Sequence, residues 1–199
     1  MSGVTSNLGN LINLGYVRTP DDEVDRIAAL IAPVGPGPLR LADPCCGEGL
    51  ALAQLKATIE GQHAVRAITY GTEADRERAE AAAGRVDQCL WSPYQDARWG
   101  QESTDVMLLN PPYTGGKTEL QFLRDIQGIL RPGGLLFYVI RQRYLRGPIA
   151  ARLAGHFDVL AVYPFLPENL GLRSDRRSHP PAGEAHGRGR QGPTGDHRP

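Results

Sequence analysis

The sequence predicts a doubly wound α/β domain built around a mostly parallel β-sheet. Short apolar segments alternate with helical segments between residues 39 and 140. Such alternation indicates parallel strands joined by right-handed crossovers, with helices covering both faces of the sheet. The chain has 199 residues, of which 41% are hydrophobic, enough for one core of about 150 residues and too little for a second large domain.

Charge and hydropathy exclude several classes of protein. The 22 basic and 22 acidic residues give a formal charge of zero, so no strong global field attracts polyanions. The longest apolar runs, such as residues 134–140, are far shorter than the roughly 20 residues of a membrane span. Residues 1–15 lack the basic and apolar parts of a leader, and the three cysteines show no metal-ligand spacing. We therefore expect a soluble, cytoplasmic protein with free thiols, no membrane partner and no metal.

The first expected element is an amphipathic helix that runs to about Ala32. Thr19 is expected to cap this helix through its hydroxyl group. Pro20 suits the first helical position, and the acids at 21–22 match the helix dipole. The Pro/Gly-rich residues 33–38 end the helix.

Strands and helices then alternate along the chain. The strands are expected at residues 39–43, 64–70, 85–90, 105–109, 135–140 and 157–163, and the helices at residues 50–59, 74–83 and 118–130. Apolar content assigns the strands, and Ala, Leu and Glu content assigns the helices. Thr118 and Gln121 predict a capping box at the start of the last of these helices.

The composition changes abruptly after Leu172. Residues 173–199 contain no large apolar residue and no cysteine, and their six arginines against three acids give a net charge of +3. Such a segment cannot form a core and is expected to be disordered. The alternatives are a nucleic-acid-binding arm and a GC-rich coding sequence read out of frame. We divide the chain into an N-terminal segment (1–18), a folded domain (19–168) and a tail (169–199).

The end of the first strand carries the first candidate site, because ligands of doubly wound sheets bind outside the carboxyl ends of the strands. Gly47 and Gly49 let the backbone approach a ligand, and the next helix directs free N–H groups at it. Asp43, which closes the strand, suits a ligand with an ammonium group better than a pyrophosphate. Glu73 ends the second strand and is placed to accept both ribose hydroxyls of an adenosine. The alternative is an ordinary acid at a helix start.

A second candidate site follows the strand at residues 105–109 and reads Asn110-Pro111-Pro112-Tyr113. Two prolines fix the backbone and remove two donors, which leaves stiff carbonyl acceptors. Asn110 adds a side-chain carbonyl, and Tyr113 adds a flat face for stacking. Such acceptors beside an aromatic ring suit a planar –NH2 group, whose lone pair they would direct for attack. The alternative is a proline-rich turn without catalytic function.

Three motifs resemble those of a known family. Asp43-Pro44-Cys45-Cys46-Gly47-Glu48-Gly49 resembles the first motif of S-adenosylmethionine-dependent methyltransferases, and residues 110–113 match the N-P-P-Y of amino-methyltransferases, chiefly those that act on adenine in DNA. Thr19-Pro20 resembles the Thr-Pro motif that binds the methionine end of the cofactor in those DNA enzymes. The order of the motifs is that of adenine methyltransferases whose recognition region follows the catalytic core.

This resemblance implies a Rossmann-like methyltransferase domain at residues 19–168 with S-adenosylmethionine as cofactor. It assigns cofactor contacts to Thr19, Asp43, Gly47, Gly49, Glu73 and Asp96, and catalysis to Asn110, Pro111, Pro112 and Tyr113. The family usually completes its sheet with an antiparallel hairpin after the sixth strand. This chain breaks at Pro164 and Pro167, so the C-terminal strand is expected to be missing.

The activity implied is methyl transfer to an exocyclic amine, with DNA as partner and a flipped adenine stacked on Tyr113. Arg141, Arg143 and Arg146 are expected to hold phosphates or to form a solvated face. The alternatives are methylation of a protein glutamine or of a ribosomal RNA guanine, and an inactive binding remnant.

Two further patterns are rejected as sites. Pro44-Cys45 is the dipeptide of cytosine-ring methyltransferases, but it lies on the first loop, where nothing evidently lowers the pKa of the thiol. The run 115–118 reads Gly-Gly-Lys-Thr and imitates the end of a phosphate-binding loop. Pro111 stands where that pattern demands its first glycine, which excludes ATP binding.

Overall fold

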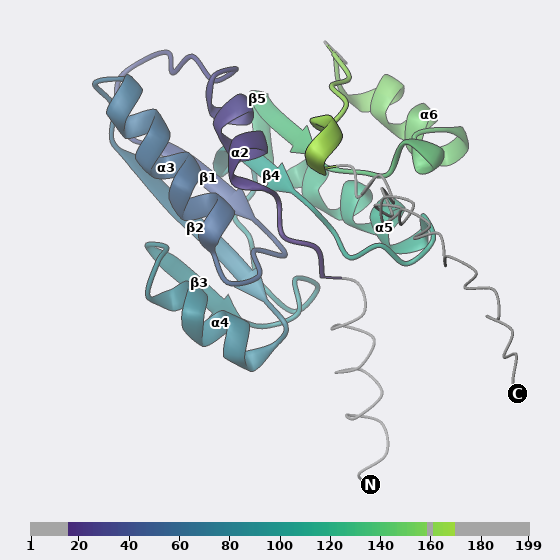
Figure 1. The fold of residues 1–199 in the computed structure, drawn as a ribbon, viewed down its shortest axis with the longest axis horizontal. Coiled ribbons are helices and arrows are strands. Elements are labelled where there is room, and N and C mark those ends of the chain that lie inside the picture. Colours follow the sequence, from purple (N-terminus) through teal and green to yellow (C-terminus); the bar gives the residue numbers. More distant parts are fainter. Residues whose placement is uncertain (1–15, 159–160, 170–199) are drawn as a thin grey trace, which may run out of the picture. The chain divides into compact units, whose positions relative to one another are not determined.

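The computed structural model describes residues 16–158 and 161–169, and its core is a five-stranded parallel sheet (Figure 1). The strands are β1 (Leu39–Asp43), β2 (Ala67–Glu73), β3 (Gln88–Trp91), β4 (Thr104–Leu109) and β5 (Leu130–Tyr138), in the order β3-β2-β1-β4-β5. The helices are α2 (Asp21–Ala28), α3 (Leu50–Gln62), α4 (Arg76–Ala83), α5 (Lys117–Asp125) and α6 (Gly147–His156), with short 3₁₀ turns η1 (Ile126–Gly128), η2 (Gln142–Tyr144) and η3 (Pro167–Asn169). The predicted doubly wound α/β fold is confirmed.

The alternation of side chains along each strand separates two cores. On one face of the sheet, Leu41 and Val106 pack against apolar residues of α2 and α3. On the other face, Ala42 and Met107 pack against apolar residues of α5 and α6. All four strand residues are at most 2% exposed. Continuous apolar strands buried on both faces are what a parallel sheet with helices on two sides requires.

The strand order reverses at β1, which pairs with β2 on one side and with β4 on the other. The chain winds outward from β1 to β3 and then returns to β4 (Figure 1). Connections from β1 and β4 therefore leave in opposite directions, and a crevice forms outside their carboxyl ends. Asp43 and Asn110, which stand at these two ends, lie at this switch point.

Several expected elements differ in the structure. Helix α6 was not among the expected elements; it begins with Gly147 and has Pro148 in its first turn. No strand forms in residues 157–158 or 161–163, the described parts of the expected last strand. Strand β5 begins at Leu130, earlier than expected, since the chain continues through Pro132 and two glycines with a register shift against β4.

Two capping predictions were wrong. Pro20, not Thr19, occupies the cap position of α2, and no side chain caps that helix. The Thr19 hydroxyl bonds to another part of the chain instead. At the start of α5, the Glu119 carboxylate accepts the N–H of Gly116 at 2.8 Å, which replaces the expected box of Thr118 and Gln121.

The contact pattern divides the chain into two units, with a boundary after Pro164. The first unit contains the sheet with all of its strands and helices, and the described part of the second is Phe165 to Asn169 with η3. The predicted tail from 173 to 199 lies outside the described residues, as do residues 1–15. No helix in the part of the chain that the structure describes is long and apolar enough to cross a membrane.

Candidate active site

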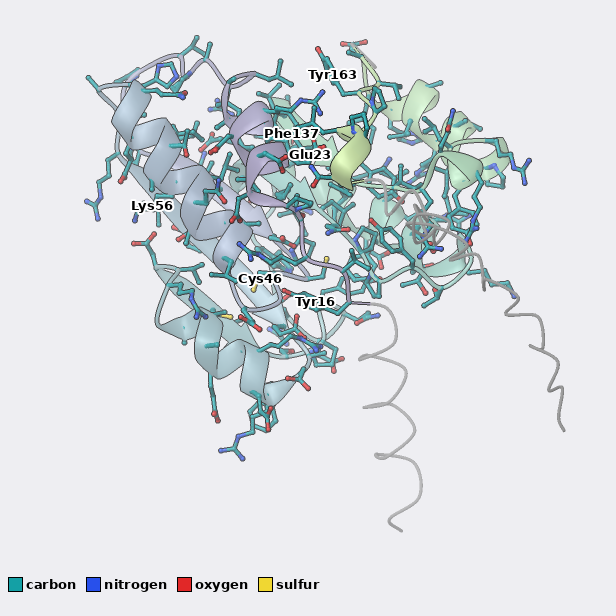
Figure 2. The ribbon with its side chains drawn as sticks, viewed as in Figure 1. Tyr16, Glu23, Cys46, Lys56, Phe137 and Tyr163 are labelled. Carbon is teal, nitrogen blue, oxygen red and sulfur yellow. The ribbon has the colours of Figure 1, made fainter. Side chains whose placement is uncertain are left out.

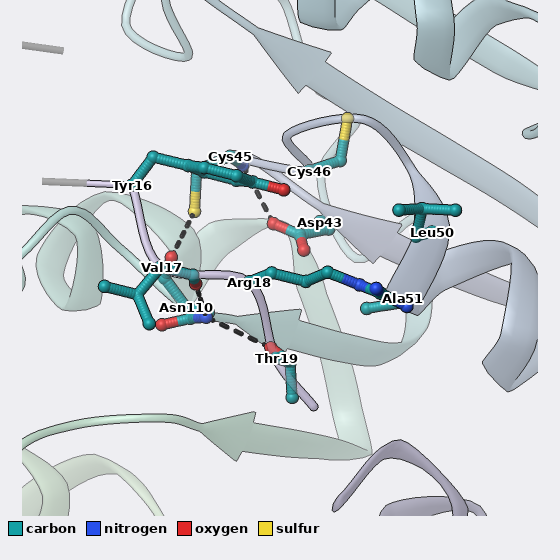
Figure 3. A pocket seen from close by; sticks show the side chains of 10 residues that line it. All are labelled: Tyr16, Val17, Arg18, Thr19, Asp43, Cys45, Cys46, Leu50, Ala51 and Asn110. Carbon is teal, nitrogen blue, oxygen red and sulfur yellow. Dashed lines mark hydrogen bonds between the residues drawn. The ribbon is translucent and has the colours of Figure 1, made fainter. Parts of the chain in front are cut away.

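The carboxyl ends of β1, β2 and β4 bring together most of the predicted site residues. A small hollow opens between the loops after β1 and β4 and the segment that precedes α2 (Figure 3). It is lined by Tyr16, Val17, Arg18, Thr19, Asp43, Cys45, Cys46, Leu50, Ala51 and Asn110. We call this space the rim hollow. Its walls join the predicted cofactor residues to the predicted catalytic loop.

Asp43 supplies the negative group of the rim hollow. Its side chain is 4% exposed, and Oδ1 accepts the N–H of Cys45 at 2.9 Å. Burial raises the pKa of this carboxyl from 3.8 to about 7. Among the described residues, no cationic side chain forms an ion pair with it. A ligand with an ammonium group would provide that missing charge.

Glu73 fastens the glycine loop to the end of β2. Its Oε2 accepts the N–H of Gly47 at 3.0 Å, and its Oε1 accepts the N–H of Asp75 at 2.9 Å. The Arg78 guanidinium lies 2.9 Å from the same Oε1. Glu73 is therefore more than a charge at a helix start. It fixes the loop conformation at Gly47, and its predicted contact with ribose hydroxyls stays a prediction.

The ring of Tyr16 covers Gly47. A Cβ atom on Gly47 would lie 2.3 Å from Cε2 of that ring, and the φ angle of +57° also demands glycine. The guanidinium of Arg78 lies 4.8 Å from the centre of the ring. Figure 2 shows Tyr16 and Cys46 at the same end of the sheet. The glycine loop is thus in contact with an aromatic side chain from the N-terminal segment.

Asn110 uses its carboxamide to join two segments that are distant in sequence. Nδ2 donates to the carbonyl oxygen of Val17 at 2.8 Å and to Oγ1 of Thr19 at 3.0 Å (Figure 3). Oδ1 accepts the hydroxyl of Tyr113 at 2.9 Å. Because a carbonyl oxygen only accepts hydrogen bonds, the contact with Val17 fixes which end of the carboxamide is the amide nitrogen.

Tyr113 is held as a neutral phenol beside this carboxamide. Burial raises the pKa of Tyr113 to about 12, although the charge of Arg141 acts in the opposite direction. The Arg141 guanidinium lies 4.8 Å from the centre of the Tyr113 ring, a cation–π distance. At neutral pH the hydroxyl is therefore protonated and available as the donor to Oδ1 of Asn110.

The two prolines between these residues carry backbone carbonyls without a donor in the part of the chain that the structure describes. Within the described residues, no group donates a hydrogen bond to the carbonyl oxygens of Pro111 or Pro112. The second lone pair of Asn110 Oδ1 is also open. An incoming –NH2 group would find acceptors for both of its hydrogens here. The arrangement is chemically suited to binding an amine, as the sequence predicts.

The cysteines of the site are thiols. The three cysteines are free, and the Sγ of Cys45 donates to the backbone carbonyl of Asn110 at 3.3 Å. Burial raises the pKa of Cys45 well above its ordinary value. A thiol in this state is a poor nucleophile, which agrees with the rejection of a catalytic cysteine. Among the described residues, no cluster of His, Cys, Asp and Glu could hold a metal ion.

Asp96 does not line the rim hollow, and no hydrogen bond among the described residues joins it to the other predicted site residues. It is exposed in the turn after β3, and its N–H bonds to the carbonyl of Pro93. Conversely, the contacts of Tyr16, Val17 and Arg141 with the site residues were not predicted. Only the aromatic and basic character of Tyr16 and Arg141 could have drawn attention to them, since the contacts join segments far apart in sequence.

Comparison with known proteins identifies the family. Residues 2–172 match the model of a family described as an uncharacterised methyltransferase family, DUF6094. The chain belongs to this family. The description of this family agrees with the expected enzyme class, a methyltransferase. No protein with a curated description matches the sequence.

Solved structures agree in fold with this DUF6094 protein. A Listeria monocytogenes structure described as a class I S-adenosylmethionine-dependent methyltransferase is 18% identical, with a TM-score of 0.57 over 69% of this chain and 50% of that one. The DUF6094 chain thus spans half the length of that protein. A modification subunit of a type I restriction enzyme from Vibrio vulnificus is 20% identical, with a TM-score of 0.44 over 58% of this chain and 31% of that one. At 18% identity the likeness to the Listeria structure shows the fold, and the expected cofactor agrees with the description of that protein.

The chemistry of the site residues suits S-adenosylmethionine, but the rim hollow is too small to hold it. A buried acid without a cation, a glycine loop and a second acid suit a nucleoside that carries an amino-acid group. The volume of the rim hollow is about 20 Å³, close to the space of one water molecule. Cofactor sites measure several hundred Å³. A cofactor bound in this hollow would require the Tyr16 side chain to move away from Gly47.

Proposed function

We propose that this DUF6094 protein transfers the methyl group of S-adenosylmethionine to the exocyclic amino group of adenine in DNA. The observation that carries the proposal is the acceptor set on the loop after β4. Oδ1 of Asn110 accepts the Tyr113 hydroxyl, and Pro111 and Pro112 lie between these two residues in the chain. The loop leaves β4 at the carboxyl end of the sheet, where Asp43 ends β1 with a charge that suits the amino-acid end of the cofactor.

In this proposal the residues of the loop after β4 act by positioning the substrate amine. When bound, S-adenosylmethionine supplies a methyl group on a sulfonium that needs no further activation. Oδ1 of Asn110 accepts one hydrogen of the amine, and a proline carbonyl accepts the other. The amine lone pair is then less conjugated with the ring and points toward the cofactor side. Tyr113 provides the stacking face, and alignment without water supplies most of the rate gain.

The local charge favours a nucleic acid over a protein substrate. Residues 126–157 contain five arginines and no acid. Arg131 pairs with Asp105, and Arg152 bonds to Gln127. The arginines at 141, 143 and 146 are exposed, and within the described residues none of them pairs with a carboxylate.

These cations stand close to the acceptor loop. Arg141 lies over Tyr113, and Arg143 lies 4.9 Å from the ring centre of Tyr144. A Cβ on Gly116 would meet that same Tyr144 ring at 3.4 Å, so η2 borders the loop that leads into α5. Planar guanidinium groups between aromatic rings suit phosphates and unstacked bases. We call Arg141, Arg143 and Arg146 the η2 cations.

A methyl-transfer assay tests this function. Purified protein is incubated with tritiated-methyl S-adenosylmethionine and, separately, with unmethylated DNA, RNA and protein. We expect label in DNA as N6-methyladenine, identified by mass spectrometry of the nucleosides. Asn110→Ala should lose at least about a hundredfold in rate, whereas Gln101→Ala, an exposed amide outside the site, should match the wild type. Label in protein or RNA alone would contradict the DNA substrate, and equal labelling by Asn110→Ala would contradict the site.

A further inference from the structure

The segment before α2 contacts the predicted catalytic carboxamide directly. Val17 and Thr19 both accept hydrogen bonds from Nδ2 of Asn110, across 93 and 91 positions of sequence. Thr19 is 3% exposed, although it follows the exposed residues Val17 and Arg18. A polar side chain that is buried at such a place must satisfy its hydroxyl group there. The Thr19 hydroxyl does so on Asn110, not on the helix that it precedes.

These contacts favour one orientation of the carboxamide. Rotation of the Asn110 side chain by half a turn would set Oδ1 against the carbonyl oxygen of Val17, where two acceptors would face each other. Nδ2 would at the same time replace Oδ1 as the partner of Tyr113. The hydroxyls of Thr19 and Tyr113 can donate as well as accept, so the Val17 carbonyl, which only accepts, distinguishes the two ends of the carboxamide. The bond to the buried Thr19 hydroxyl adds to the energy that keeps Nδ2 beside that carbonyl.

We propose that Thr19, together with the backbone carbonyl of Val17, is a positioning residue that holds Oδ1 of Asn110 toward the amine to be methylated. This inference rests on the proposed function, since the orientation matters only where Asn110 accepts from an –NH2 group. In the rotated orientation, the N–H groups of Asn110 would face the N–H groups of the amine. The amine would then be repelled, and its lone pair would not be directed at the methyl group.

This role differs in its consequences from the contact that the family resemblance implies for Thr19. A residue that binds the methionine end of the cofactor affects cofactor affinity. A residue that orients Asn110 affects the rate of transfer and leaves the cofactor dissociation constant unchanged. The two roles are therefore separated by measuring rate and affinity on the same variants.

The experiment compares Thr19→Val, which lacks the hydroxyl but keeps the shape, with Thr19→Ser, which keeps the hydroxyl. Thr19→Ala is a second variant without the hydroxyl, for use if the valine variant folds poorly. The matched control is Thr58→Val on α3, whose hydroxyl bonds to Asp25 away from the loop. Calorimetry gives the affinity for S-adenosylmethionine, and single-turnover methylation of a duplex DNA oligonucleotide gives the rate.

A further measurement does not depend on the substrate. The side-chain amide hydrogens of Asn110 are observed by ¹⁵N NMR, with the signals assigned by their loss in Asn110→Ala. We expect these hydrogens to exchange with solvent about tenfold faster or more in Thr19→Val and Thr19→Ala, and to regain protection in Thr19→Ser. The methylation rate should fall about tenfold or more in the same two variants, with unchanged cofactor affinity.

Two results would overturn the inference. One is unchanged exchange of the Asn110 hydrogens in the variants without the hydroxyl. The other is weaker cofactor binding with an unchanged rate of transfer. Failure of the DNA substrate is a separate outcome, because wild-type protein would then leave DNA unlabelled while the exchange measurement still reports whether Thr19 holds Asn110.

Discussion

If Asp43 binds the ammonium group of the cofactor as we propose, cofactor binding depends on pH. Its pKa is raised to about 7 by burial, and the ammonium group of the cofactor needs the ionised form. We expect the affinity for S-adenosylmethionine to decrease as the pH falls below about 7, by up to tenfold for each pH unit. Calorimetry between about pH 5.5 and 7.5 measures this. Asp43→Asn should bind weakly and without this pH dependence, and an equal pH profile in wild type and Asp43→Asn would contradict the assignment.

The same carboxyl lowers the stability of the protein without cofactor. Because the pKa in the folded state lies above the ordinary 3.8, the folded protein is favoured at low pH, and this contribution is lost as the pH rises to about 7. The full difference corresponds to about 4 kcal/mol. Asp43→Asn should therefore unfold at higher temperature than wild type above about pH 7, with a smaller difference at pH 5. Asp158→Asn, an exposed carboxyl, serves as the control, and a destabilised Asp43→Asn at high pH would refute the argument.

Gly47 and Tyr16 are expected to be coupled in stability. Alanine at Gly47 would place its methyl carbon 2.3 Å from the Tyr16 ring, and overpacking of this kind costs about 1–3 kcal/mol. Tyr16→Ala removes the collision, so the double variant should be more stable than the sum of the single effects, by at least about 0.5 kcal/mol. Urea unfolding measures the free energy of unfolding of the wild type, the two single variants and the double variant.

Backbone strain must be separated from this collision. Gly37→Ala is a suitable control, since Gly37 has a φ of +104° and no atom lies within 4 Å of its Cβ position. The decrease in the free energy of unfolding of Gly37→Ala reports the strain of a positive φ alone, about 1–2 kcal/mol. Additive effects of Tyr16→Ala and Gly47→Ala would show that the two residues do not touch in solution.

The sequence could predict those site residues that directly follow or end a strand, because the sheet places them together in space. Asp43, Glu73 and Asn110 stand at strand ends, and parallel strands bring such ends to one edge. Local chemistry predicted Thr19 as a helix cap, and that prediction was wrong; its cofactor contact, which the family resemblance implies, stays a prediction. The Thr19 hydroxyl bonds to Asn110 instead of capping the helix, and a contact between segments about ninety residues apart leaves no local pattern.

At the scale of elements, prediction succeeded where apolar content and burial agree. β4 is buried along its whole length, and its sequence is correspondingly continuous and apolar. α6 was not predicted, and it begins with Gly147 and with Pro148, a residue that is tolerated in the first turn of a helix. The start of β5 was missed because Pro132 and the following glycines are typical of a turn. In both cases packing against the sheet outweighs local propensity.

The η2 cations give a prediction at this scale. Replacement of Arg141, Arg143 and Arg146 by glutamine removes three positive charges beside Tyr113 without adding an acid. We expect weaker binding to duplex DNA, and a slope of log affinity against log salt that is smaller by about 0.9 for each phosphate that the variant no longer neutralises. Fluorescence anisotropy with a labelled oligonucleotide at several salt concentrations measures both quantities.

A control arginine at the amino ends of the strands, opposite the site, makes this test specific. Arg66 is exposed and immediately precedes β2, so it lies far from the carboxyl ends of the strands. Arg66→Gln should leave both the affinity and the salt slope unchanged. An unchanged slope in the triple variant would remove the electrostatic argument for nucleic acid and return the protein substrate to consideration.

At the scale of the whole folded unit, the sheet brings together three separate segments whose contacts close the site. The glycine loop, the loop after β4 and the segment before α2 meet around a volume of about 20 Å³. The first two are fixed to strands of a buried core, whereas the third precedes an eight-residue helix. The Tyr16 side chain covers Gly47 and is the part that has to move for a cofactor to enter this hollow, while Val17 and Thr19 keep their contacts with Asn110.

Hydrogen exchange measured by mass spectrometry tests this movement. Before cofactor is added, amides of residues 16–20 should exchange faster than those of α3, whose Leu55 and Ile59 are fully buried. Saturating S-adenosylmethionine should change the exchange of residues 16–20 and 45–49 together, because Tyr16 cannot stay over Gly47 while the cofactor is bound. Peptides from α3 beyond its first turn should be unaffected. If exchange at 45–49 changes while exchange at 16–20 does not, the cofactor enters without displacing Tyr16, and the closed hollow is not the barrier inferred from its volume.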